Sequence, residues 1–122
     1  MVEKPAAATL VADDRGRYVD CDDAACELLG YTRDELLQMS VWQLTPNGHE
    51  VDGLVMWQEF LKLGVQAGIY WLVRKDRSLV EVEYRAVANA RPEGHVSWLR
   101  KMDLGREPFP ASRLPARRAR QV

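Results

Sequence analysis

The sequence has few cysteines and histidines, the usual ligands of metal sites, and it has no long apolar run of the kind that spans a membrane. It has 2 cysteines, Cys21 and Cys26, and 2 histidines in 122 residues. The spacing of the cysteines does not match the tight pairs of zinc sites, so we expect two buried or half-buried thiols and no metal site. No run of about 20 apolar residues exists, and the N-terminus lacks the layout of a signal peptide. These absences predict a cytoplasmic protein with no membrane partner.

An excess of either charge is also missing. The chain has 17 basic and 18 acidic residues and a net charge of −1, which gives no general attraction to nucleic acid. Basic residues concentrate in residues 105–122, where prolines interrupt the chain, and we expect a disordered basic tail there. Its arginines can contact phosphates nonspecifically, but no recognition helix accompanies them. No specific nucleic-acid partner is therefore expected.

The signatures of common catalytic sites are absent as well. The sequence has no glycine-rich phosphate loop and no pairing of a nucleophile with a histidine. Acidic residues gather at Asp13, Asp14, Asp20, Asp22 and Asp23, but turns and helix caps explain each position. We therefore expect no catalytic residues, and the chain is predicted not to be an enzyme.

The sequence does contain a clear order of strand and helix patterns. After a leader at residues 1–6, alternating or helical periodicity predicts each element in turn. The expected elements are strands at 8–12 and 17–21, a helix capped by Asp22 or Asp23, a short helix after Thr32, a long helix at about 50–63, and strands at 68–75, 79–88 and 95–102. Helices inserted between two groups of strands predict an α+β fold, with one antiparallel sheet covered by helices on one face.

The segment from Gly16 to Pro46 carries the most specific local signals. Thr32 and Glu35 have the spacing of a capping box, in which each side chain accepts from the backbone N–H of the other residue. Gly30 stands where the preceding helix needs a left-handed residue to end. These signals predict two short helices separated at Gly30.

The motifs in this order resemble the PAS domain family over residues 7–104. The matching motifs are Arg17-Tyr18-Val19, Ala24-Ala25, Leu28-Leu29-Gly30-Tyr31, Glu35-Leu36-Leu37, Trp42 to Pro46, and Arg74-Lys75-Asp76. The resemblance implies a five-stranded antiparallel sheet with a pocket between its inner face and the helices. It also implies a sensory or dimerisation role in signalling, through a phosphorelay or transcriptional regulation.

Two departures from the family bear on cofactors. Flavin-binding light sensors of the family carry a reactive cysteine before the long helix, whereas residues 45–49 contain none. Haem-binding members use a histidine on the long helix, and residues 50–64 contain none. Neither haem nor cysteinyl-flavin chemistry is therefore expected, and no other cofactor is indicated.

The resemblance assigns a ligand pocket to inward-facing side chains of the expected elements. The candidates are Leu29, Leu36, Trp42, Leu54, Val55, Phe60, Tyr70, Leu72, Val82, Tyr84, Val96 and Trp98. The polar groups within this set are the hydroxyls of Tyr70 and Tyr84 and the indole N–H groups, and a small apolar ligand is one expected partner for the tyrosine hydroxyls. A filled core is the alternative, because the same residues would pack a dry interior.

The outer face of the sheet is expected to carry an apolar group made of Ile69, Trp71, Val73 and Leu99. An exposed apolar group of this kind normally needs cover. A homodimer would cover it, and residues 1–8 folding back are the alternative. The sequence therefore predicts a sensory module that acts through ligand binding, dimerisation or both. The alternative is a ligand-free dimerisation module with a filled core; a separate signalling partner is possible in either case.

Overall fold

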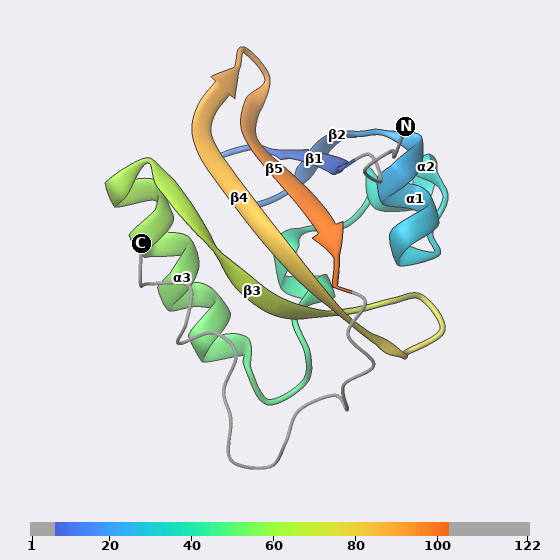
Figure 1. Ribbon diagram of the computed structural model, residues 1–122. Coiled ribbons are helices and arrows are strands. Elements are labelled where there is room, and N and C mark those ends of the chain that lie inside the picture. Colours follow the sequence, from blue (N-terminus) through green and yellow to red (C-terminus); the bar gives the residue numbers. More distant parts are fainter. Residues whose placement is uncertain (1–6, 103–122) are drawn as a thin grey trace, which may run out of the picture.

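The computed structural model describes residues 7–102 and folds them into one five-stranded sheet with its helices (Figure 1). The elements are β1 (Ala8–Ala12), β2 (Tyr18–Cys21), α1 (Asp23–Leu29), α2 (Arg33–Leu36), the 3-10 helix η1 (Val41–Leu44), α3 (Glu50–Leu63), β3 (Val65–Val73), β4 (Leu79–Arg91) and β5 (Gly94–Lys101). The predicted leader at 1–6 and tail at 105–122 lie outside the described residues.

The sheet has the order β2-β1-β5-β4-β3, and all neighbouring strands are antiparallel. The last strand, β5, lies in the middle between β1 and β4, although these two strands are far apart in the sequence (Figure 1). The predicted α+β architecture is confirmed. This order also pairs the first strand with the last, so the sheet is complete only when β5 lies between β1 and β4.

The helices begin and end where the local chemistry predicts. The carboxylate of Asp22 accepts a hydrogen bond from the backbone N–H of Ala25 and caps α1, and Gly30 ends that helix with a φ of 83°. The capping box of α2 is complete: Thr32 Oγ1 accepts from the Glu35 N–H at 3.1 Å, and Glu35 Oε1 accepts from the Thr32 N–H at 2.8 Å. These short helices are therefore stabilised by their caps as well as by packing.

Two predicted boundaries were wrong. The loop expected at residues 89–94 is mostly strand, because β4 continues to Arg91 and β5 begins at Gly94. The regular register between these strands is interrupted between Val87 and Arg91, and Asn89 takes a φ of 55° within the irregularity. An irregularity in the pairing of two continuing strands, and not a loop, therefore accommodates Asn89. Similarly, β3 begins at Val65 and not at Gly68.

The main core lies between α1, α2 and the sheet. Leu29 and Leu36 are fully buried there with Ala25 and Leu44, against Leu10 from β1. None of the helices within residues 7–102 has the length and apolar character needed to cross a membrane. This core fixes one end of the sheet and leaves α3 to pack at the other (Figure 1).

Candidate functional site

A small apolar cavity lies between the inner face of the sheet and the segment formed by η1 and α3. Its volume is about 130 Å³. Its lining residues come from all five strands, η1 and α3: Leu10, Tyr18, Val41, Trp42, Thr45, Gly53, Met56, Trp57, Phe60, Gln66, Tyr70, Leu72, Val82, Tyr84, Ala86, Ser97 and Leu99. A concave, mostly apolar space with a few polar groups is the usual form of a small-molecule site.

Aromatic rings form the helical wall of this cavity. The rings of Trp42 and Trp57 meet edge to face with centroids 5.9 Å apart, and Trp57 lies 5.6 Å from Phe60. His95 lies on β5, and its ring contacts both Trp57 and Phe60 edge to face. The wall is therefore built on η1 and α3 and is braced against the sheet through His95.

Three polar side chains of the cavity lining, Gln66, Tyr70 and Tyr84, lie on the neighbouring strands β3 and β4. The Tyr84 hydroxyl donates to Gln66 Oε1 at 2.9 Å, and Gln66 Nε2 donates to the Met56 carbonyl oxygen at 3.0 Å. The Tyr70 hydroxyl is also buried, but it has no hydrogen-bond partner among the described residues. A buried hydroxyl without a partner loses its hydration without compensation. Unlike the Tyr84 hydroxyl, the Tyr70 hydroxyl therefore has an unused hydrogen-bond donor.

Both tyrosine hydroxyls have a raised pKa. Burial raises the pKa of Tyr70 to about 12, with the nearby carboxylates of Asp52 and Glu50 as smaller causes. Burial likewise raises the pKa of Tyr84. Both hydroxyls are protonated at neutral pH: that of Tyr84 donates to Gln66, and that of Tyr70 remains an unpaired donor among the described residues.

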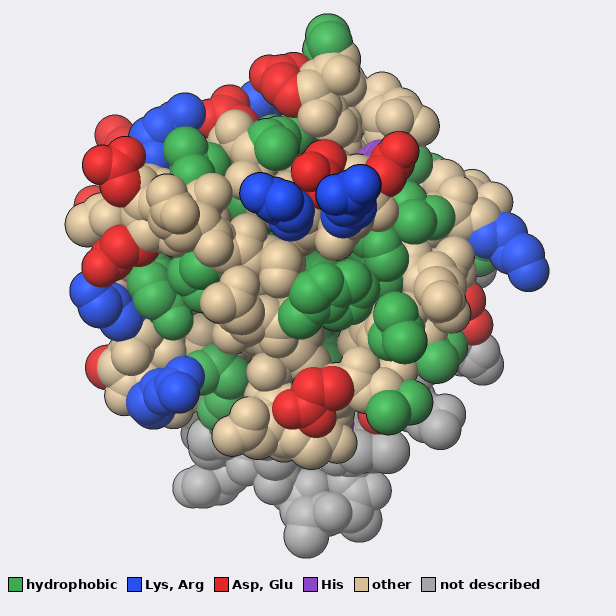
Figure 2. All heavy atoms as spheres, turned by 180° about the vertical axis from the view of Figure 1, so that it is seen from behind, with side chains coloured by type: hydrophobic (Ala, Val, Ile, Leu, Met, Phe, Trp, Pro, Cys, Tyr) green, Lys and Arg blue, Asp and Glu red, His purple; other side chains and the backbone are tan. Residues whose placement is uncertain are grey.

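Six of the twelve predicted pocket residues line the cavity: Trp42, Phe60, Tyr70, Leu72, Val82 and Tyr84. Leu29 and Leu36 are fully buried, but they belong to the core beneath α1 and α2 and do not line the cavity. Leu54 and Val55 are each 45% exposed on α3. Figure 2 shows hydrophobic side chains at the surface in the right-hand half of its view, where α3 lies after the rotation. Leu54 and Val55 therefore lie on the part of α3 that faces away from the cavity.

The predicted orientation of β5 was reversed. Ser97 and Leu99 line the cavity, so the alternate residues Val96 and Trp98 lie on the outer face of the sheet. Tyr84 of the inner face pairs with Leu99, and this register determines the orientation. Because side chains alternate along a strand, an error of one residue exchanges the two faces completely. Val96 and Trp98 are therefore corrected from pocket to outer face, and Leu99 from outer face to cavity.

The predicted apolar group on the outer face is only partly exposed. Ile69 and Val73 are half-buried, whereas Trp71 is buried with 7% of its surface accessible. Trp98, which was not predicted to lie on this face, is 36% exposed. The exposed aromatic side chain of the outer face is therefore on β5 and not on β3.

Several lining residues were missed by the sequence reasoning. Met56 and Trp57 belong to the predicted long helix, but helical periodicity did not indicate which of its apolar residues face the sheet. Gln66 lay before the predicted start of its strand and therefore received no face. No local signal would have identified Gln66, because its two partners come from α3 and β4.

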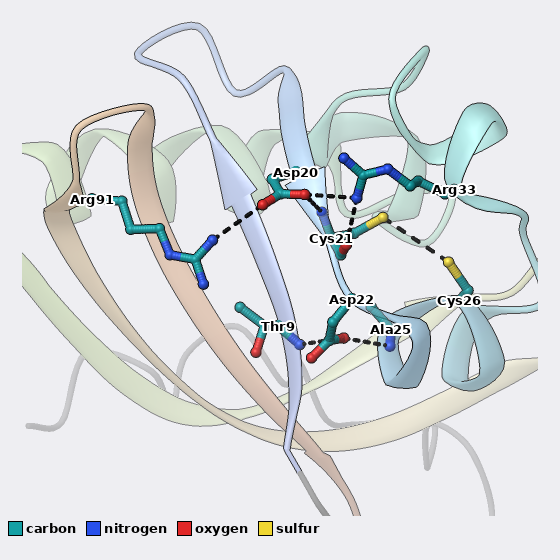
Figure 3. Close-up of polar contacts among 8 residues, drawn as sticks. All are labelled: Thr9, Asp20, Cys21, Asp22, Ala25, Cys26, Arg33 and Arg91. Carbon is teal, nitrogen blue, oxygen red and sulfur yellow. Dashed lines mark hydrogen bonds and ion pairs between the residues drawn. The ribbon is translucent and has the colours of Figure 1, made fainter.

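A second polar cluster lies at the corner where β2 meets α1 and α2 (Figure 3). The Asp20 carboxylate pairs with Arg33 at 2.7 Å and with Arg91 at 3.1 Å. The hydrogen bond from Arg33 is the main cause that lowers the pKa of Asp20. Within residues 7–102, no group of three or more potential metal-ligating side chains lies together. This corner therefore connects three elements, β2, α2 and β4, through charge, away from the cavity.

Comparisons with known proteins agree with this geometry. A family model described as PAS domain matches residues 6–97. The PAS domain of a protein from Desulfitobacterium hafniense is similar at 18% identity, with a TM-score of 0.71, over 79% of this chain and 92% of that one. A domain of a sensory box sensor histidine kinase/response regulator from Geobacter sulfurreducens is 21% identical, with a TM-score of 0.66, over 80% of this chain and 85% of that one.

A third similar structure is the PAS domain of a LuxR-family transcriptional regulator from Burkholderia thailandensis, solved in complex with ethanol. It is 18% identical, with a TM-score of 0.65, over 79% of this chain and 88% of that one. At these identities the structural likeness shows a shared fold. No curated protein sequence matches the chain significantly.

Proposed function

Because the chain belongs to the PAS domain family, whose members are sensory modules of histidine kinases and transcriptional regulators, we propose that it senses a small apolar ligand that carries one hydrogen-bond acceptor. The observation that carries this proposal is the buried Tyr70 hydroxyl, which has no partner among the described residues and belongs to a side chain that lines the cavity. A ligand carbonyl, ether or hydroxyl oxygen would accept its hydrogen bond.

The size of the cavity limits the ligand. An engineered apolar cavity of about 150 Å³ in another protein binds benzene, and the cavity here is of similar size at about 130 Å³. The ligand class is therefore a small ketone, aldehyde or alcohol with an apolar body. The ethanol held by the similar domain from Burkholderia thailandensis belongs to this class.

A ligand in this cavity would act on the position of α3. It would contact Trp57 and Phe60 on that helix and Tyr70 on the sheet at the same time. Binding that favours one arrangement of helix and sheet shifts the population toward it. We propose that the module is non-catalytic, acts in the cytoplasm and passes this shift to a signalling partner.

The test uses two probes of matched size, cyclopentanone and cyclopentane, with thermal unfolding and isothermal titration as readouts. We expect both to bind the wild-type chain and only cyclopentanone to lose affinity in Tyr70→Phe, by roughly tenfold, the value of one hydrogen bond. Tyr84→Phe is the matched control, since its hydroxyl already has Gln66 as a partner. Equal loss for both probes in Tyr70→Phe would contradict the assigned role of the hydroxyl.

A second function is favoured by Trp98, which is 36% exposed on the outer face of the sheet. We propose that a second copy of the chain covers Trp98 together with the half-buried Ile69 and Val73. Sedimentation of the purified chain tests this, with Trp98→Glu expected to shift a dimer to a monomer. A dimer that binds neither probe would instead support a ligand-free dimerisation module, and native mass spectrometry would reveal any ligand retained from the cell.

A further inference from the structure

The two cysteines of the chain lie in contact at the corner between β2 and α1. Cys21 Sγ and Cys26 Sγ are 4.0 Å apart, and both thiols are free (Figure 3). A disulfide bond has an S–S distance of about 2.05 Å, so the two sulfurs must approach by about 2 Å. Neither residue lines the cavity. The pair is therefore a separate feature from the proposed ligand site.

The backbone of Cys21 is held in place from both sides. Its N–H donates to Asp20 Oδ1 at 2.9 Å, and its carbonyl oxygen accepts from Arg33 at 2.8 Å. The Asp20 carboxylate is in turn paired with Arg33 and Arg91 (Figure 3). The Cys21 thiol is thus presented from a fixed strand end.

Cys26 is presented from a helix whose start is also fixed. Asp22 Oδ1 accepts from the Ala25 N–H at 2.9 Å and from the Thr9 N–H at 3.0 Å, which ties the first turn of α1 to β1. The two sulfurs therefore face each other from elements that are anchored independently. Such an arrangement keeps the two thiols in contact.

The two thiols differ in their access to solvent. Cys26 is half-buried, whereas only 7% of Cys21 is accessible. Burial raises the pKa of the Cys21 thiol, and the neighbouring Cys26 adds to the effect. Because Cys26 is the more accessible of the two residues, it is the thiol that an oxidant meets first.

We propose that Cys21 and Cys26 form a reversible redox site that reacts with hydroperoxides and closes to an intramolecular disulfide. The Cys26 thiolate attacks the terminal peroxide oxygen, which gives a sulfenic acid and releases the alkoxide or hydroxide as an alcohol or water after protonation. The Cys21 sulfur then attacks the Cys26 sulfur and displaces water as the S–S bond forms. In total two thiols lose two electrons and two protons, and the peroxide is reduced.

This reaction gives the module an input that is independent of the cavity. The disulfide would bind α1 to the end of β2 through a closed loop that spans residues 21–26. Thiol exchange with a dithiol reductant reverses it. The site responds to peroxide while the cavity responds to a small apolar ligand.

The first test exposes the wild-type chain to a tenfold excess of hydrogen peroxide, followed by thiol alkylation and intact mass spectrometry. We expect the loss of two hydrogens, no alkylation, a monomer on a non-reducing gel, and full recovery of both thiols with dithiothreitol. An intermolecular disulfide, or a sulfinic acid at Cys26 with Cys21 still open to alkylation, would overturn the proposal. This measurement needs no variant and does not depend on the folding of one.

The second test assigns the order of the two sulfurs. In Cys21→Ala, we expect Cys26 to accumulate a sulfenic acid, which dimedone traps. The rate of trapping should equal the rate at which the wild-type chain loses its thiols. In Cys26→Ala, Cys21 is expected to react at least about tenfold more slowly because it is buried. Equal rates in the two variants would contradict the assigned order. Circular dichroism before oxidation verifies that each variant is folded.

Discussion

The Tyr84 hydroxyl donates a hydrogen bond to the Gln66 side chain at 2.9 Å, across the paired strands β4 and β3. The other end of the same amide donates to the Met56 carbonyl oxygen on α3 at 3.0 Å. Gln66 on β3 therefore links β4 to α3 through its two hydrogen bonds at the cavity. Its two bonds also fix the orientation of the amide, because the oxygen must accept and the nitrogen must donate.

Replacing Gln66 with leucine tests this link. The variant loses both hydrogen bonds and leaves the hydroxyl of the half-buried Tyr84 without this partner, so we expect the free energy of unfolding to fall by about 2 kcal/mol. Urea unfolding followed by tryptophan fluorescence measures the loss. Tyr84→Phe removes only one of the two bonds and should cost less. An equal loss in both variants would show that the bond to Met56 contributes nothing.

Gly94 begins β5 where that strand passes β1. A Cβ atom at this position would overlap the carbonyl oxygen of Ala12, and backbone on both strands would have to move. We expect Gly94→Ala to lower the free energy of unfolding by about 3 kcal/mol. Glu93→Ala, at the exposed neighbouring position, is the control and should change stability little. Thermal unfolding compares the two, and similar melting temperatures would be inconsistent with the overlap.

The ion pairs of Asp20 make a pH-dependent contribution to stability. Its pKa is lowered in the folded state, chiefly by the hydrogen bond from Arg33. A carboxylate with a lowered pKa stabilises the fold above its ordinary pKa of about 3.9, and this contribution disappears as the pH falls through the folded-state pKa. We therefore expect Asp20→Asn to be less stable than the wild-type chain at pH 7 and equally stable at the acid limit.

Urea unfolding of the two chains between pH 2 and pH 7 measures this difference. Asp34→Asn, at an exposed position on α2, is the control and should follow the wild-type profile. A difference between Asp20→Asn and the wild-type chain that stays constant with pH would contradict the role of the ion pairs.

Asp22 has a double role that a simple helix cap does not have. Its carboxylate caps α1 through the Ala25 N–H and also accepts from the Thr9 N–H on β1. We expect Asp22→Ala to lower the free energy of unfolding by about 2 kcal/mol, which exceeds the typical loss of a cap alone. Hydrogen exchange at the Thr9 amide should accelerate in the same variant. Glu27→Ala, at an exposed position on the same helix, should leave that amide protected.

Much of the fold could be predicted because its signals are local. The spacing of Thr32 and Glu35 defines a capping box within four residues, and Gly30 can end a helix by itself. Alternation along residues 79–88 assigned Val82 and Tyr84 to the inner face correctly. These features depend on neighbours in the sequence, so the sequence contains what is needed to predict them.

The cavity could be predicted only in part, because its residues meet through long-range contacts. Trp42, Phe60 and Tyr70 were placed correctly, whereas Leu54 and Val55 were assigned to the wrong side of α3. Periodicity shows that a helix has an apolar arc, but the sheet against which it packs decides which part of the arc is buried. Gln66 was missed for the same reason, since both of its partners lie on other elements.

The sequence by itself determined the element order, the caps and the family, since each rests on short motifs in a fixed order. Only the tertiary structure decided the faces of β5, because pairing with β1 and β4 sets the register, and a shift of one residue exchanges Trp98 with Leu99. It also brought the thiols of Cys21 and Cys26 into contact, since the angle between β2 and α1 sets that distance.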